Sequence, residues 1–277
     1  MPILAVSSQV SVGHVGNAAA VPALERLGHT VWRVDTVAFS NHPGHGRHSG
    51  CVRPDHEVRD LLHGIGRHTG WRGCTGVYSG YLGEAGSGWA VADAVDAARA
   101  AEPHLVYVCD PVIGDHGRSF VRDGVEKAIR ERLVPRATAI TPNAFELERL
   151  SGHRVETVAD AHAAGVILLE WGPDVVIGTG IPDGDHLAIV MVTVDGGRVV
   201  RTRRRDRAFF GTGDLFAALF LGHYLAQRDP GRAMSRSVAG LDVVTEATEA
   251  AGTVDLALIP NLPAIVRADR PDIGEKL

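Results

Sequence analysis

The most informative stretch of this 277-residue chain is Gly211-Thr212-Gly213-Asp214-Leu215-Phe216-Ala217-Ala218. It stands where a series of short apolar runs gives way to a long helical pattern, residues 212–227. Glycines let backbone N–H groups approach an anion with no Cβ in the way, and a helix N-terminus adds about half a positive charge. The pattern is typical of an anion hole for a phosphoryl group in transfer, with Asp214 placed to accept a proton from an attacking hydroxyl. For these residues alone, an ordinary helix cap explains the pattern equally well.

Before this stretch, apolar runs alternate with amphipathic segments. They predict strands at 3–6, 31–34, 76–78, 105–109, 139–140 and 174–177, and helices at 18–27, 55–65, 89–101, 121–133, 145–150 and 158–170. This βαβ alternation is typical of a parallel sheet covered on both faces. Asp195-Gly196-Gly197 predicts a hairpin between strands 187–194 and 198–202. A last helix is expected at 231–251. Because no repeat or linker is evident, we expect one domain, 1–277, with a frayed tail at 267–277.

The composition excludes several classes of protein. The chain has 28 Lys and Arg against 33 Asp and Glu, a net charge of −5, which argues against binding nucleic acid through bulk charge. Three cysteines at irregular spacing rule out a disulfide framework and indicate a reducing, cytoplasmic compartment. No apolar run approaches the ~18 residues that a membrane span needs, and residues 1–6 do not resemble a signal peptide.

Polar residues that follow the predicted strands are candidates for a site, because open parallel sheets bind ligands beyond the carboxyl ends of their strands. In the segment Thr141-Pro142-Asn143-Ala144-Phe145-Glu146, Asn143 and Glu146 share one helix face. They could hold Mg²⁺-bound water beside phosphates, or simply cap the helix. Asp110, at the exit of strand 105–109, is a candidate for contact with Mg²⁺ or a nucleotide. Cys109 is expected to be an inert core residue.

Two further segments are rich in ionisable side chains. His42, His45 and His48 have a spacing that suggests zinc, but the Pro-Gly pair between the first two denies them a helix face. A loop covering a substrate is the better interpretation. The basic run 201–207, which begins at Arg201, is either a solvated hairpin arm or a loop near the phosphates or base of a nucleotide.

Taken together, these segments resemble the successive signatures of pyridoxal kinases. In the family's order they are 8–17 (SQVSVGHVGN), 37–42 (VAFSNH), 79–81 (SGY), 109–112 (CDPV), 141–146 (TPNAFE) and 211–218 (GTGDLFAA). The GHVGN and FSNH stretches are specific to that family, whereas GTGD is shared across the wider ribokinase superfamily. The resemblance covers residues 3 to about 225. It implies a ribokinase-like three-layer α/β/α sandwich with a central, mostly parallel sheet, assembled as a homodimer.

The resemblance also implies an activity. The family transfers a phosphoryl group from MgATP to the 5′-hydroxyl of pyridoxal, a salvage route to pyridoxal 5′-phosphate, and commonly uses K⁺ near the anion hole. By position, Asp214 is the base and Gly211, Thr212 and Gly213 form the anion hole. The positions that match the acceptor site are Ser8, His42, Pro43 and Tyr81. Those that match the MgATP site are Asp110, Phe120, Thr141, Asn143, Glu146 and Thr179, with Asp110 and Glu146 toward Mg²⁺.

The chain departs from the family pattern mainly around the acceptor. Gln9 stands where the family often has His, and Val12 stands where it often has Tyr. Pro43 replaces a frequent Thr, and His45 replaces a frequent Tyr. Phe120 stands in place of a lid tyrosine, and Gly178 stands where a Thr or Lys often meets ATP, beside Thr179.

Three other functions fit the sequence less well. One is a kinase of another hydroxymethyl heterocycle such as hydroxymethylpyrimidine, against which the GHVGN stretch argues. Another is a non-catalytic vitamer-binding protein, which would not need Asp214. A dinucleotide-binding dehydrogenase is weaker still, because no G-x-G-x-x-G follows the first strand.

Overall fold

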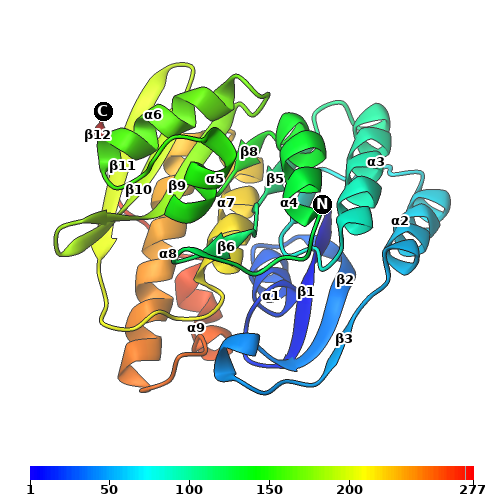
Figure 1. The fold of residues 1–277 in the computed structure, drawn as a ribbon, viewed down its shortest axis with the longest axis horizontal. Coiled ribbons are helices and arrows are strands. Elements are labelled where there is room, and N and C mark those ends of the chain that lie inside the picture. Colours follow the sequence, from blue (N-terminus) through cyan, green and yellow to red (C-terminus); the bar gives the residue numbers. More distant parts are fainter. Residues whose placement is uncertain (272) are drawn as a thin grey trace.

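A twisted sheet forms the centre of the structure, a computed structural model that describes residues 1–271 and 273–277 (Figure 1). In sheet order the strands are β12 (Glu275–Lys276), β11 (Gly196–Arg203), β10 (His186–Thr193), β9 (Val175–Asp183), β8 (Ala139–Ile140), β5 (Val106–Cys109), β4 (Gly76–Ser79), β1 (Pro2–Val12), β2 (Thr30–Asn41) and β3 (Gly50–Val52). The pairs from β9 through β8, β5, β4 and β1 to β2 are parallel, and the remaining pairs are antiparallel. The predicted mostly parallel sheet is therefore confirmed.

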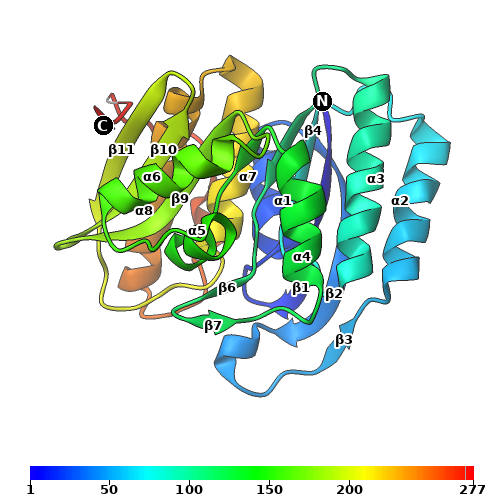
Figure 2. The same cartoon turned by 45° about the horizontal axis from the view of Figure 1, so that its top comes forward.

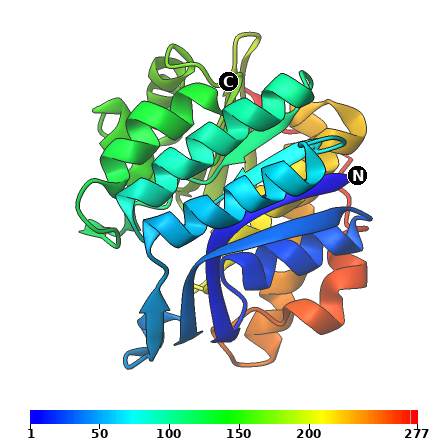
Figure 3. The same ribbon diagram turned by 90° about the vertical axis from the view of Figure 1, so that its right-hand side faces the viewer.

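Helices cover both faces of this sheet, and Figure 3 shows the layers from the side. One face carries α2 (Asp55–Thr69), α3 (Ala85–Ala101), α4 (Val125–Ala128), α5 (Ala144–Ser151) and α6 (Val158–Leu169). The other carries α1 (Asn17–Arg26), α7 (Thr212–Gln227), α8 (Pro230–Ala250) and α9 (Leu258–Ile265). The result is the three-layer α/β/α sandwich that the sequence predicts.

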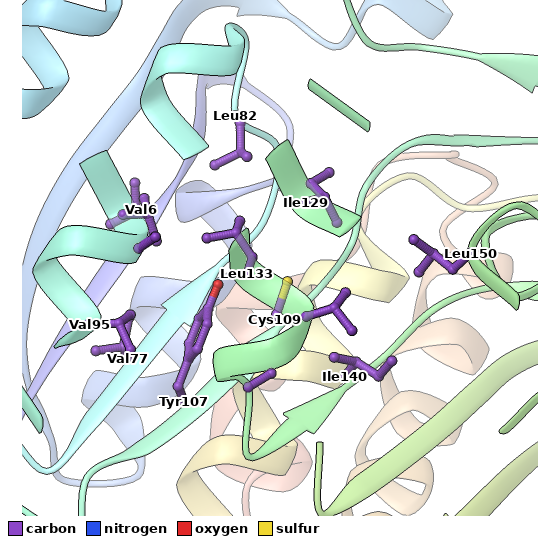
Figure 4. Close-up of a cluster of buried hydrophobic side chains, with 14 of the residues drawn as sticks. Val6, Val77, Leu82, Val95, Tyr107, Cys109, Ile129, Leu133, Ile140 and Leu150 are labelled. Atoms are coloured by element: carbon purple, nitrogen blue, oxygen red, sulfur yellow. The ribbon is translucent and has the colours of Figure 1, made fainter. Parts of the chain in front are cut away.

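The strands are apolar on both sides because each side meets a helix layer. In β1, Leu4 and Val6 pack into the core under α2–α6, whereas Ile3 and Ala5 pack into the core under α1 and α7–α9. All four side chains are fully buried. Figure 4 shows part of the first core, in which Val6 lies near side chains of β4, β5 and α3.

Several predicted boundaries were wrong. The strands expected at 3–6 and 31–34 extend to Val12 and Asn41, because their polar ends still pair with each other. The helix expected at 121–133 is α4 followed by a π-helical turn over Ile129–Leu133. Helix α9 was missed because it contains Pro260 and Pro263, which normally interrupt helices.

The remaining segments add small features around the sheet. A hairpin of β6 (Gly114–Asp115) and β7 (Arg118–Ser119) follows β5 and is hydrogen-bonded to the start of α5 (Figure 2). The tail 267–277 was expected to fray, and it includes residue 272, which lies outside the described residues. Within this tail, residues Glu275–Lys276 pair with strand β11. In the part of the chain that the structure describes, no helix has the length and apolar character to cross a membrane.

Candidate active site

The candidate residues gather at the carboxyl edge of the parallel strands, where α7 begins. Asp110 follows β5 directly, and Thr141 follows β8 directly. The Thr141 hydroxyl donates a hydrogen bond to Asp110 Oδ1 at 3.1 Å, so the two strand ends are linked. This is the edge at which an open α/β sheet binds its ligand.

The glycine turn before α7 packs against the loop that follows β1. Gly211 has φ +92°, and a Cβ there would overlap the carbonyl oxygen of His14. Gly213 differs, because its φ is not positive and a Cβ there would meet only Asp110 Oδ2, at 3.8 Å. The turn is therefore tightly packed at Gly211 and open at Gly213, where an anion has room to approach the backbone.

Asp214 lies in the first turn of α7, partly buried. The Tyr78 hydroxyl donates a hydrogen bond to Asp214 Oδ1 at 2.9 Å. Burial raises the pKa of Asp214, and hydrogen bonds from the Gly16 backbone and from Tyr78 oppose that rise. Tyr78 is 136 residues away in the chain and fully buried in β4, and it was not among the predicted site residues. Its position directly before Ser79-Gly80-Tyr81 was the only available signal.

Three carboxyl groups lie close enough to interact here. Asp110 is 6% exposed, and burial first, then the neighbouring Glu146 and Asp214, raises its pKa well above the usual range. Burial also raises the pKa of Glu146 to about 8. Interacting buried carboxylates repel one another unless a proton or a cation compensates them. Mg²⁺, a hard cation that takes oxygen ligands, fits such a compensating role.

Among the described residues, no group of three or more His, Cys, Asp or Glu side chains forms a metal cage. Mg²⁺ in kinase sites is usually held by one or two carboxylates together with the substrate phosphates. The carboxylate with room for such a role is Asp110, whose Oδ2 faces the open side of Gly213.

Glu146 and Asn143 cap helix α5. Each side chain accepts the backbone N–H of the other residue, both at 2.9 Å. The second Glu146 oxygen accepts the N–H groups of Ile113 (2.9 Å) and Gly114 (3.3 Å). Asn143 Nδ2 in turn donates to the Gly114 carbonyl at 2.8 Å. The helix-cap interpretation is confirmed, and the same pair anchors the start of the β6–β7 hairpin.

Two of the predicted acceptor residues, Ser8 and Tyr81, lie within β1 and just after β4. Ser8 is partly buried next to Gly16, at which a Cβ would overlap Ser8. The Tyr81 carbonyl accepts a hydrogen bond from the Thr36 hydroxyl at 2.6 Å. The Tyr81 hydroxyl donates to the carbonyl of Phe120 at 3.3 Å, and the Phe120 side chain itself is 55% exposed. Tyr81 thus connects the acceptor side with the segment after β7.

The histidine loop folds toward the glycine turn. Pro43 opens a short 3₁₀ turn, Pro43–His45. The His42 ring lies 4.2 Å from the Phe210 ring between centroids, and His45 Nε2 lies 3.0 Å from Asp255 Oδ1. Burial, and then the nearby His45, lowers the pKa of His42. These contacts support a covering loop. Nothing local in the sequence pointed to Phe210 or Asp255.

The two remaining predicted residues lie farther along the sheet. Thr179 in β9 donates its backbone N–H to the carbonyl of Pro142 at 2.8 Å, beside the start of α5. Arg201 in β11 forms ion pairs with Asp183 (2.6 Å) and Glu275 (2.7 Å). These contacts fit the solvated hairpin arm, the first of the two interpretations of this basic run.

Three comparisons with known proteins each match the chain to a small-molecule kinase. A family model described as phosphomethylpyrimidine kinase matches residues 74–255. The chain is 40% identical over 270 residues to a pyridoxal kinase of Rubrobacter xylanophilus, covering 95% of this chain and 93% of the relative. It is 41% identical over 268 residues to one of Deinococcus radiodurans, covering 93% and 90%. A solved pyridoxal kinase from Leishmania donovani, in complex with ADP and pyridoxamine, superposes with a TM-score of 0.90 at 27% identity, over 96% of each chain.

Proposed function

Because this chain belongs to the pyridoxal kinase family, we propose that it transfers the terminal phosphoryl group of ATP to the 5′-hydroxyl of pyridoxal. The observation that carries the proposal is the Asp214 carboxylate, which stands at the N-terminus of α7 beside the open backbone of Gly213. A base and an anion hole side by side are what phosphoryl transfer to an alcohol requires. A protein that only binds the vitamer would not need the base.

The reaction uses Asp214 and the start of α7 in one step. Asp214 accepts the proton of the 5′-hydroxyl while the hydroxyl oxygen bonds to the γ-phosphorus. The bond from that phosphorus to the β–γ bridging oxygen breaks, and ADP leaves. The backbone N–H groups of residues 211–213 and the positive end of α7 stabilise the charge on the transferring group. Such transfer depends mainly on positioning and charge stabilisation.

Mg²⁺, when bound with ATP, would neutralise the phosphate charge. Asp110 is the residue we expect to hold it. Both oxygens of Glu146 already accept backbone N–H groups, so Glu146 would act through a water molecule and through the β6–β7 anchor. K⁺ near the anion hole, a homodimeric assembly and a cytoplasmic location also remain proposals. Rates in KCl against NaCl and light scattering test the first two.

The acceptor is tested by competition between heterocycles. Hydroxymethylpyrimidine is a second candidate, because the matching family model describes a phosphomethylpyrimidine kinase. The purified protein is incubated with MgATP and each of pyridoxal, pyridoxamine, pyridoxine and hydroxymethylpyrimidine, and phosphorylated products are separated and identified. We expect the highest kcat/KM with pyridoxal. A product from hydroxymethylpyrimidine alone would reassign the acceptor, and ATP binding with no product from any acceptor would overturn the kinase proposal.

A further inference from the structure

Tyr78 is a fully buried tyrosine whose hydroxyl reaches the proposed base. It lies in β4 and packs into the core under α1 and α7–α9. Its hydroxyl donates to Asp214 Oδ1 at 2.9 Å. Burial raises the pKa of this phenol well above its usual value of 10, and the Asp214 charge raises it further. The phenol therefore stays protonated and acts as a hydrogen-bond donor.

The hydroxyl of Tyr78 has little freedom to move. A Cβ on Gly80 would lie 2.6 Å from it and 2.5 Å from the Ser7 hydroxyl, so the backbone closes around both oxygens. Ser7 Oγ also accepts the backbone N–H of Tyr81 at 3.2 Å. The segment that carries Tyr81, a proposed acceptor residue, is thereby held by the Ser7 hydroxyl, which lies beside the hydroxyl of Tyr78.

We propose that Tyr78 is a positioning residue for the base of the phosphoryl transfer, an inference that rests on the proposed function. By holding Oδ1, the phenol fixes the plane of the carboxylate that takes the proton of the acceptor hydroxyl. A hydrogen bond donated to a carboxylate is stronger than one between neutral groups, and it offsets part of the cost of burying the charge. The effect should appear in kcat, since neither ATP nor pyridoxal needs to contact Tyr78.

The test is a double-mutant cycle between Tyr78→Phe and Asp214→Asn. If Tyr78 acts through Asp214, Tyr78→Phe should lower kcat roughly ten- to a hundredfold, the usual weight of one hydrogen bond to a charged group. Both KM values should stay within about threefold of the parent. In the Asp214→Asn background the same substitution should change the residual rate by less than about threefold, because the base it positions is gone.

Tyr107→Phe is the matched control. Tyr107 is equally buried, in the neighbouring strand β5, and its side chain packs into the opposite core (Figure 4). Its hydroxyl forms a 2.7 Å hydrogen bond with the Ser79 hydroxyl. The substitution removes one buried hydroxyl of the same kind, away from Asp214. We expect its kcat to stay within about threefold of the parent.

Each outcome decides a separate point. Unchanged kcat in Tyr78→Phe, or equal losses in the parent and in Asp214→Asn, would overturn the positioning role. If Tyr78→Phe folds but is too unstable for the kinetic assay, the cycle is followed by thermal melting. Loss of stability confined to the parent background supports the proposal, and equal loss in both refutes it. Full activity of Asp214→Asn would instead refute the base itself, and with it the proposed mechanism.

Discussion

The two glycines of the turn before α7 should respond differently when each is replaced by alanine. We expect one substitution to lower stability and the other to lower activity. At Gly211 the backbone is left-handed, with φ +92°, and a Cβ would overlap the carbonyl oxygen of His14. At Gly213 the φ is not positive, and the nearest atom to a Cβ is Asp110 Oδ2 at 3.8 Å, an ordinary contact. The same substitution therefore meets a backbone obstacle at one site and free space at the other.

The expected sizes differ accordingly. The left-handed conformation costs an L-residue about 1–2 kcal/mol, and the overlap with His14 adds to it. Gly211→Ala should therefore lower the free energy of unfolding by about 2 kcal/mol or more, which is roughly 4 °C in Tm for a chain of this size. Gly213→Ala should leave Tm unchanged or slightly raised, since Ala favours a helix over Gly by up to about 1 kcal/mol. It should nonetheless reduce kcat by roughly 10²-fold, the usual cost of losing an anion-hole contact.

Thermal melting and steady-state kinetics on both variants measure the two effects. A Gly213→Ala enzyme with the parent's kcat would mean that no phosphate approaches the backbone there. A Gly211→Ala protein with the parent's Tm would mean that the contact with His14 is not as tight as the structure indicates.

Two further substitutions test the cap and the acceptor pocket. Burial raises the pKa of Glu146 to about 8 in the folded state, whereas the pKa of an unfolded Glu is about 4.3. The contribution of the protonated Glu146 to the free energy of unfolding is therefore complete below pH ~4.3, and it is lost as the pH rises to about 8. Urea unfolding of Glu146→Gln should show less of this loss, and identical pH dependence in parent and variant would contradict it. Pro43→Thr, alone and with Val12→Tyr, restores hydroxyls usual in the family and should lower KM for pyridoxal roughly five- to a hundredfold for two hydrogen bonds. An unchanged KM for pyridoxal would refute this interpretation of the pocket.

The order of strands and helices was predictable because buried strands are continuous apolar runs. The segment Val106–Cys109 is one example, and it forms β5 as expected. The predicted helix at 212–227 is α7 with the same bounds. The hairpin at Asp195-Gly196-Gly197 also formed, since β10 and β11 pair from Thr193 and Gly196.

The missed features depend on contacts between distant parts of the chain. In the sequence, Tyr78 has the pattern of any buried strand residue. Its contact with Asp214 arises only when the chain folds. Glu146 showed the pattern of a cap in sequence, but its bonds to Ile113 and Gly114 join segments 32 or more residues apart. Pairing across such separations leaves no local pattern. Residue types at the site were therefore predictable, and their partners were not.

The central claim is that Asp214 is the base for phosphoryl transfer, and Asp214→Asn tests it most directly. The substitution keeps the shape of the side chain and removes its ability to take a proton. Single-turnover phosphorylation of pyridoxal should slow by about 10²–10⁴-fold, while the Kd for MgATP stays within about threefold of the parent. A rate loss smaller than about threefold, with ATP still bound, would contradict the assignment of Asp214 as the base.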